Sequence, residues 1–400
     1  MAGGLRRLGL GVIVTLALPA AAAGQAPGLQ EFEGPIHEHT AYSDGEPGTR
    51  PADAFAAVRG HGSDFMALTE HSDTLQLPIV TNTKCFEPQV LVTCLFSDQE
   101  DELDSLRKWD AMAEQTDAAT DAGFVGIRGF EWTNDRHGHI NVLFSRHNTN
   151  AKIDGGYLSM SFFWSWFTRP ASQGGGADGL AIFNHPGRRE LGELVPGGFI
   201  SPFTPDIPLP GSDWDDFAFV PAADARMVGI ELFNGGSDYG SPNDLHPAGS
   251  YGQALDRGWH VGAVGAEDTH DTGWGRPEER KTVVLAPALS RADLRDSMLA
   301  RRFYAVRHAG IRMSFTVDGQ EMGSRLSVAA GDPLAVEAGT PEPGATVELV
   351  TSGGEVVAGG PGSLSVSRPA SAAERWYFVR VRDAEGESLA YSSPVWVEAG

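Results

Sequence analysis

The chain has 400 residues, of which 41% are hydrophobic, so it is long enough for a large domain and a smaller one with ordinary packed cores. Its formal charge of −23, from 30 Lys and Arg against 53 Asp and Glu, argues against a non-specific nucleic-acid binder, because such proteins hold the phosphate backbone with basic patches. The 50 glycines and 25 prolines follow no repeat period, which indicates many turns and long loops.

Residues 1–26 have the features of a secretory signal peptide. Arg6 and Arg7 precede an apolar run at 8–18, and the small residues at 20–23 suit cleavage. A membrane anchor is the alternative, but the run is short for a span of roughly 20 residues, and no second apolar stretch follows. We therefore expect a soluble, exported protein, periplasmic or extracellular, with no membrane span after the signal is cleaved.

The motif HEHTAYSDG, at 37–45, opens the part of the chain that carries candidate ligands. Side chains alternate between the faces of a strand, so His37 and His39 point to the same side and can reach one ion. A turn predicted at 43–45 brings the Asp44 carboxylate back toward them. Two histidines at this spacing can also be ordinary surface residues, so the prediction depends on the later motifs.

Apolar runs that end in polar residues recur along the chain, and helices are predicted between several of them, at 51–60, 98–122 and 251–257. Such an alternation favours a parallel sheet, and about seven units favour a barrel that brings every strand end to one mouth. A lone histidine after a strand is more often a hydrogen-bonded residue than a ligand, but recurrence favours ligands. The polar ends hold Glu70 and His71, then Glu131, His139, Asn184 and His185, Glu231 and Asn234, and Glu267, Asp268 and His270.

The chain has two cysteines, Cys85 and Cys94. Their closeness in an exported protein favours a local disulfide, with two free thiols as the alternative. The pair alone argues against a structural zinc site, because such a site needs four ligands and the chain has no further cysteine.

Two inserts, at 151–178 and 191–226, follow ligand-bearing strands and should overhang the mouth of a barrel. The first is rich in Phe and Trp at 162–167. These aromatic residues form either a wall that shapes the substrate site or the core of an added helix.

The pattern changes near the end of the first domain, where Ser290 caps a predicted helix at 291–301. From residue 311 on, β-prone runs alternate with turns such as Asp318-Gly319 and 352–354. We expect 311–400 to form a small all-β sandwich, an accessory domain without a catalytic site of its own.

The ordered motifs resemble those of the PHP family of metal-dependent hydrolases, and the signal peptide with the trailing β domain is similar to its CehA/McbA-like branch. The resemblance covers residues 34–310 and implies an α/β fold, a PHP-type distorted (β/α)7 barrel at 27–310 followed by the all-β sandwich at 311–400. The matching motifs are H-x-H followed by SDG, Thr-Glu-His at 69–71, the glutamate at 131, GH-I-N at 138–141, Asn-His-Pro at 184–186 and Asp-Thr-His at 268–270.

The resemblance also implies three divalent metal ions. The family often has aspartate where this chain has Glu70, which leaves His71 in place but puts the role of the acid in doubt. His137 could exchange roles with His139, although the GH-I-N context favours His139. The implied ligands are His37, His39, Glu131 and Asp268 for one ion, Glu131 with His139 and His185 for a second, and Asp44, His71 and His270 for a third.

Mixed imidazole and carboxylate ligands suit zinc, manganese or iron better than calcium. Three carboxylates cannot neutralise three divalent ions, so the loaded site would attract an anion, and a metal-bridging hydroxide would attack a phosphoester. The chain has neither G-x-S-x-G nor H-E-x-x-H, which agrees with the lack of a side-chain nucleophile. A water on the third ion or a nearby residue would protonate the leaving group, and His270 and Arg188 are the candidate residues. Arg188, Arg189 and Arg276 either grip the substrate anion or are ordinary surface residues.

The leading hypothesis is a phosphoesterase that acts on a small-molecule anionic or aryl ester. A carbamate or carboxylic ester hydrolase at the same site is the first alternative, which aromatic residues at 162–167 would favour. A non-catalytic exported binding protein with structural metal is the second. Amidohydrolase barrels also begin with H-x-H, but they usually place a lysine bridge where this chain has Glu131. The substrate, the native metal and the oligomeric state are left open.

Overall fold

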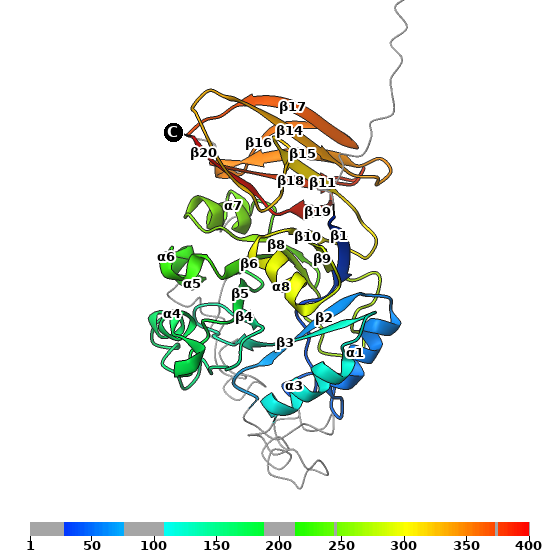
Figure 1. Ribbon diagram of the computed structural model, residues 1–400, viewed down its shortest axis with the longest axis vertical. Coiled ribbons are helices and arrows are strands. Elements are labelled where there is room, and N and C mark those ends of the chain that lie inside the picture. Colours follow the sequence, from blue (N-terminus) through cyan, green and yellow to red (C-terminus); the bar gives the residue numbers. More distant parts are fainter. Residues whose placement is uncertain (1–27, 76–107, 188–212, 244–245, 373–374, 400) are drawn as a thin grey trace, which may run out of the picture.

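The computed structural model describes residues 28–75, 108–187, 213–243, 246–372 and 375–399 (Figure 1). The predicted signal peptide, both cysteines, Arg188 and Arg189 lie outside these ranges, and the predictions about them stay predictions. Within the described ranges, no helix has the length and apolar character that a membrane crossing requires.

One curled sheet forms the ring-like part of the fold, with the strand order β2-β3-β4-β5-β6-β8 and the short β7 beside β6. Its strands are almost entirely buried, as expected for a sheet that is covered on both faces. Their bounds are β2 Phe65–His71, β3 Val125–Trp132, β4 Ile140–Leu143, β5 Leu180–Phe183, β6 Met227–Asn234, β7 Ser237–Asp238 and β8 Gly262–Ala266.

The expectation of a parallel sheet fails at β4, which runs antiparallel to both β3 and β5. Only residues 133–139 connect β3 to β4, and a parallel crossover needs roughly a dozen residues or more. The pairs β2 with β3, β5 with β6 and β6 with β8 are parallel, as expected. The regular alternation of strand and helix is therefore interrupted in the middle of the ring.

Residues 35–39, which contain the H-x-H motif, lie between the two open edges of this sheet. On one side, the amide of Thr69 in β2 donates to the carbonyl of Glu38 at 3.0 Å. On the other side, the amide of His39 donates to the carbonyl of Thr269 at 3.1 Å, and Glu38 and Thr269 form a parallel bridge. This segment therefore lies between the two edges of the curled, half-barrel sheet.

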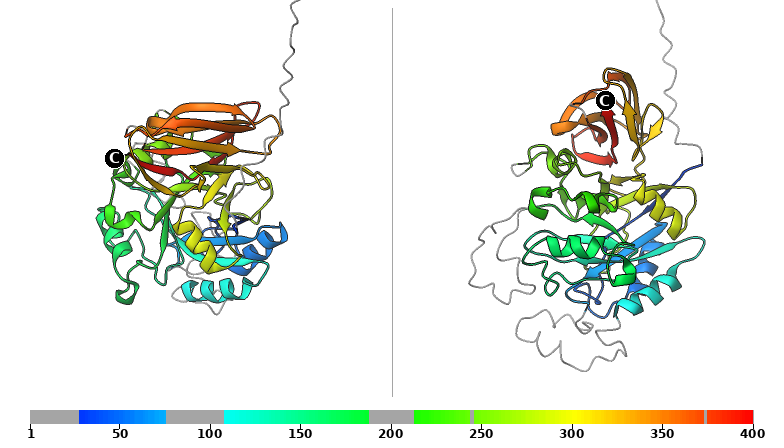
Figure 2. Two further views of the ribbon diagram at one scale, coloured as in Figure 1. Left: turned by 45° about the horizontal axis from the view of Figure 1, so that its top comes forward. Right: turned by 60° about the vertical axis from the view of Figure 1, so that its left-hand side comes forward.

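Helices surround the ring, as Figures 1 and 2 show. The predicted helix at 51–60 is confirmed, and the cap of α8 is as expected, because Ser290 accepts a hydrogen bond from the amide of Asp293 at 3.0 Å. The helices are α1 Pro51–Gly60, α3 Lys108–Ala119, α4 Ser161–Thr168, α5 Trp214–Phe217, α6 Pro221–Asp224, α7 Gly249–Asp256 and α8 Arg291–Leu299.

Most aromatic residues of α4 pack into the hydrophobic core, as expected for an added helix. Phe163, Trp166 and Phe167 are buried, and the ring of Phe163 lies 4.6 Å from that of Trp132. Trp164 is partly buried, and Phe162 has 46% of its surface exposed. The described aromatics of α4 therefore do not form an open wall above the ring.

The β-rich C-terminal residues form two sheets that share a second hydrophobic core, seen at the top of Figure 1. The larger sheet continues across the predicted boundary at residue 311, because β10 pairs with β19. It contains β1 Gln30–Gly34, β9 Lys281–Ala286, β10 Phe303–Val306, β13 Arg325–Val328, β15 Thr346–Thr351, β16 Glu355–Pro361, β18 Trp376–Arg382, β19 Ser388–Ser392 and β20 Val395–Ala399. The smaller sheet contains β11 Ser314–Val317, β12 Gln320–Glu321, β14 Pro333–Gly339 and β17 Ser363–Pro369.

Candidate metal centre

The ends of the ring strands and the 37–45 segment bring imidazoles and carboxylates to one place. Four groups of side chains have ligand atoms within 4.8 Å of one another, and together they contain all nine predicted ligands. Their roles as ligands stay predictions. The groups are His39, Asp44, His71 and His270; His37, His39 and Glu131; His37, His185 and Asp268; and His71, Glu131 and His139.

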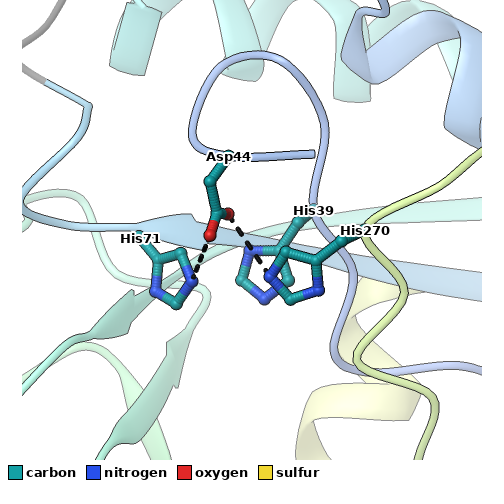
Figure 3. Close-up of side chains that lie close together, drawn as sticks. All are labelled: His39, Asp44, His71 and His270. Atoms are coloured by element: carbon teal, nitrogen blue, oxygen red, sulfur yellow. Dashed lines mark ion pairs between the residues drawn. The ribbon is translucent and has the colours of Figure 1, made fainter. Parts of the chain in front are cut away.

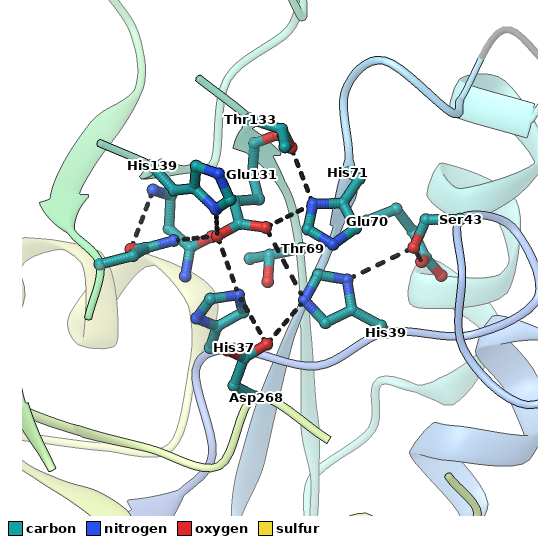
Figure 4. Close-up of polar contacts among 12 residues, drawn as sticks. His37, His39, Ser43, Thr69, Glu70, His71, Glu131, Thr133, His139 and Asp268 are labelled. Carbon is teal, nitrogen blue, oxygen red and sulfur yellow. Dashed lines mark hydrogen bonds and ion pairs between the residues drawn. The ribbon is translucent and has the colours of Figure 1, made fainter. Parts of the chain in front are cut away.

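Glu131, at the end of β3, is the centre of this arrangement (Figure 4). Its Oε1 lies 3.0 Å from Nδ1 of His139 and 3.1 Å from Nε2 of His185. Its Oε2 lies 2.6 Å from Nδ1 of His71. One buried carboxylate therefore faces imidazoles from several strand ends, the arrangement expected of a bridging ligand.

Asp268 follows β8 and lies against both histidines of the H-x-H motif. Its Oδ1 is 3.4 Å from Nε2 of His37 and 3.1 Å from Nε2 of His39. Residues 37–39 are not in a named strand, but Glu38 between the two histidines forms a bridge with Thr269, and both rings face Asp268.

The outer group of four surrounds Asp44 (Figure 3). Oδ2 of Asp44 lies 3.3 Å from Nε2 of His71, and Oδ1 lies 3.3 Å from Nε2 of His270. The ring of His39 stacks between those of His71 and His270, with centroids 4.4 and 4.3 Å apart. The predicted turn at 43–45 is thus folded back toward the histidines.

The grouping differs in detail from the one that the resemblance implies. His139 falls with His71 and Glu131, and His185 falls with His37 and Asp268. Both histidines still contact Oε1 of Glu131, so the pairing around that carboxylate is retained. His137 belongs to none of the four groups, and its Nδ1 lies 3.3 Å from Asp215.

Glu231 was assigned no role from the sequence, yet it fixes the ring of His37. Its Oε1 lies 2.7 Å from Nδ1 of His37, and its Oε2 accepts the amide of His185 at 2.7 Å. A signal was present in the sequence, because GFEWTN at 129–134 and GIELFN at 229–234 place a glutamate at the same point of two strands.

Glu70, the residue before His71, is buried beneath the turn at 40–45. It accepts the amide of Thr40 at 3.0 Å and hydrogen bonds from the hydroxyls of Thr40 and Ser43. The Ser43 hydroxyl in turn lies 3.3 Å from Nδ1 of His39. Burial raises the pKa of Glu70 to about 7, although these hydrogen bonds oppose the shift. Glu70 therefore anchors the turn that carries Asp44.

The charges of the cluster are mutually stabilised. Burial disfavours ionised Glu131 and Asp268, but the facing imidazoles outweigh it and hold the pKa of both carboxyls well below the usual range. Burial likewise disfavours protonated His37, but Asp268, Glu231 and Glu131 raise the pKa of His37 well above its usual value. Burial and the neighbouring His270 and His71 lower the pKa of His39 to about 3, so this ring is neutral.

The donor atoms fit a divalent cation. Four buried atoms make no hydrogen bond to the described residues: His37 Nε2, His39 Nε2, Asp44 Oδ1 and Glu131 Oε2. Glu131 Oε2 and Asp44 Oδ1 face imidazoles of the same cluster, and His37 Nε2 and His39 Nε2 face its carboxylates, so all four atoms converge where a cation can be shared. Imidazole nitrogen with carboxylate oxygen suits zinc, manganese or iron. The buried clusters are therefore able to hold divalent metal.

Comparisons with known proteins give little further support. No family model and no curated protein matches the chain. A crystal structure of a two-domain protein containing a predicted PHP-like metal-dependent phosphoesterase, from Bacteroides vulgatus ATCC 8482, is similar over 94% of this chain and 99% of its own, with 17% identity and a TM-score of 0.44. A crystal structure of an engineered protein covers 91% of this chain and 94% of its own, with 13% identity and a TM-score of 0.17. At such TM-scores neither likeness carries a conclusion about function.

Proposed function

We propose that the protein is a metal-dependent hydrolase, and specifically a phosphoesterase of small-molecule anionic esters. The observation that supports this proposal is the convergence of nine imidazole and carboxylate side chains, with Glu131 among them. Their positions agree with the motifs of the PHP resemblance, in which three divalent ions are expected.

The residues that would hold the ions are those of the four groups described above. When bound, zinc, manganese or iron ions act as Lewis acids that lower the pKa of water toward neutrality and stabilise charge on phosphoryl oxygens. The chain itself supplies no nucleophile in this proposal. Its contribution is to hold the ligands in fixed positions and to move protons.

Several contacts keep the ligands in place. Glu231 orients His37, and Thr133 lies 2.7 Å from Nδ1 of His71 through its hydroxyl. The side-chain amide of Asn184 donates to Oε1 of Glu131 at 2.9 Å. Such outer contacts fix the orientation of a ligand, and an acceptor such as Glu231 also raises the basicity of the histidine that it holds.

His270 is the described candidate for giving a proton to the leaving group. Its side chain is 39% exposed, and its Nε2 lies 3.3 Å from Oδ1 of Asp44. Burial opposes the proton, but Asp44 and Asp268 outweigh it and raise the pKa of His270. A protonated imidazole at the rim suits a general acid when two ions are bound, whereas His270 would be an unprotonated ligand if a third ion were held with Asp44 and His71. Arg188 stays a prediction as the other candidate.

The two alternatives are outcomes of the test. Exposed aromatic residues at 162–167 would have favoured an aryl leaving group. Most of them are buried in α4, so they give no support to a carbamate or carboxylic ester substrate. A non-catalytic metal-containing binding protein would hold ions without turnover.

The experiment is a metal count per chain followed by assays with p-nitrophenyl phosphate, bis-p-nitrophenyl phosphate and naphthyl methylcarbamate, with manganese or zinc supplied. We expect at least two ions per chain and hydrolysis of a phosphate ester, with both reduced in Glu131→Gln. Hydrolysis of the carbamate alone would favour the first alternative. Bound metal with no turnover would favour the second, and a protein that binds no metal would overturn the proposal.

A further inference from the structure

A second buried cluster lies on the opposite face of the H-x-H segment. Glu38 stands between His37 and His39, and strand alternation points its side chain away from theirs. Glu38, Glu267 and Lys281 are all buried, and Glu267 and Lys281 are the charged groups that act most strongly on the Glu38 carboxyl. None of these three belongs to the four candidate metal-binding groups.

Lys281, in β9, holds Glu267 rigidly. Its ammonium donates to Oε1 of Glu267 and also to the carbonyls of Arg276 at 2.8 Å and Glu279 at 3.1 Å. The other oxygen of Glu267 accepts the amide of Gly275 at 2.8 Å. Both carboxylate oxygens of Glu267 are therefore tied to the chain that follows β8.

Asp268, the next residue, has a backbone conformation that needs such support. Its φ is 57°, in the left-handed region that residues other than glycine adopt at a cost. Residues in this region persist when the surrounding structure fixes them. The amide of Asp268 donates to the carbonyl of His37 at 3.0 Å, and its carboxylate reaches both histidines of the motif.

We propose that Lys281 is a positioning residue of the metal centre, which acts through Glu267 to hold Asp268 in its left-handed conformation against His37 and His39. The proposal rests on the proposed metal-dependent function. A buried ion pair is by itself a weak source of stability, because desolvation offsets much of the attraction. The geometry gives the Lys281–Glu267 pair a different role. It ties Glu267, the residue before Asp268, to the backbone of residues 275–279, which follow Asp268.

The test compares Lys281→Met, Glu267→Gln and the double variant in the full chain. A single substitution leaves a buried charge unpaired, which destabilises the fold whatever its role, whereas the double variant removes both charges. We measure zinc affinity by competition with a chromophoric chelator, the absorption spectrum of the cobalt-loaded protein, and the thermal unfolding temperature. Arg301→Met is the matched control, because Arg301 is a buried cation that donates to the carbonyls of Asp224 and Met227, away from the candidate ligands.

If Lys281 positions Asp268, the double variant regains an unfolding temperature close to that of the wild type but binds zinc about 10- to 100-fold more weakly, with an altered cobalt spectrum. Arg301→Met lowers the unfolding temperature and leaves affinity unchanged. A double variant with wild-type affinity and spectrum would overturn this inference alone. If the double variant does not fold, Glu267→Gln is used in its place. Weaker zinc binding with an altered cobalt spectrum would then support the inference, and wild-type values would overturn it. A wild-type protein that binds no zinc would overturn the metal centre and the inference with it.

Discussion

Nδ1 of His37 lies 2.7 Å from Oε1 of Glu231, and Nε2 of the same ring faces Asp268 at 3.4 Å. The carboxylate therefore fixes which nitrogen is directed toward the candidate metal centre. Paired carboxylate and histidine of this kind orient the ring and increase its basicity toward a metal.

The first prediction follows from this contact. Glu231→Gln keeps the size of the side chain and removes its charge, so it should weaken zinc binding by about 10- to 100-fold. A chelator competition assay measures the change. Glu348→Gln is the control, because Glu348 pairs with Arg380 and Arg382 in the C-terminal β sheet. Equal affinity in the wild type and Glu231→Gln would contradict the assigned role.

The second prediction concerns protons. Burial works against protonation of His37 and His71, but neighbouring carboxylates raise the pKa of both well above the usual value. A metal ion needs these nitrogens without their protons, so binding should release protons, and the apparent affinity should rise with pH up to the raised pKa values. Calorimetry in two buffers of different ionisation enthalpy measures the release. Binding heats that do not depend on the buffer would count against it.

The third prediction uses Glu70, whose pKa rises from 4.5 to about 7 in the folded chain because it is buried. The folded state then holds this proton more tightly than the unfolded state. Stability from Glu70 is fully present below the unfolded pKa and is lost as the pH rises through the folded pKa, by up to about 3 kcal/mol.

Urea unfolding of chelator-treated wild type and Glu70→Gln, across this range of pH, measures that dependence. The amide does not titrate, so the stability of the wild type relative to the variant should fall as the pH rises. A difference that stays constant with pH would show that Glu70 titrates normally.

The fourth prediction compares two neighbours in α4. Phe163 is buried against Trp132, so Phe163→Ala should lower the free energy of unfolding by about 3–5 kcal/mol. Phe162 is 46% exposed, and Phe162→Ala should cost about 1 kcal/mol or less. Chemical denaturation of both variants measures these values. Equal effects would mean that α4 is not packed as described.

The resemblance to the PHP family implied the nine candidate ligands, and strand alternation and strand ends, which are local properties, account for part of that set. His37 and His39 share a face for that reason, and Asp44 follows in a turn that polar residues favour. Glu131 was recognisable because it ends an apolar run. These features do not depend on how the strands are paired.

The rest depends on contacts between distant parts of the chain. The reversal of β4 follows from a short connection whose length the apolar pattern did not reveal. The roles of Glu231 and Lys281 arise from partners far along the chain or outside their own strands, His37 and Glu267. The left-handed backbone at Asp268 is likewise imposed by its surroundings, since aspartate itself only tolerates that conformation.

The short segment at 35–39 has a consequence for how the ring comes apart. It meets Thr69 on one side and Thr269 on the other through only a few backbone hydrogen bonds, so the ring has a seam there. An ion shared by His37 and Asp268 would join the two sides of this seam, and because it binds the folded chain alone it would stabilise that state by mass action. Loss of metal would then expose the backbone hydrogen bonds of residues 35–39 to solvent exchange before those of the sheet interior.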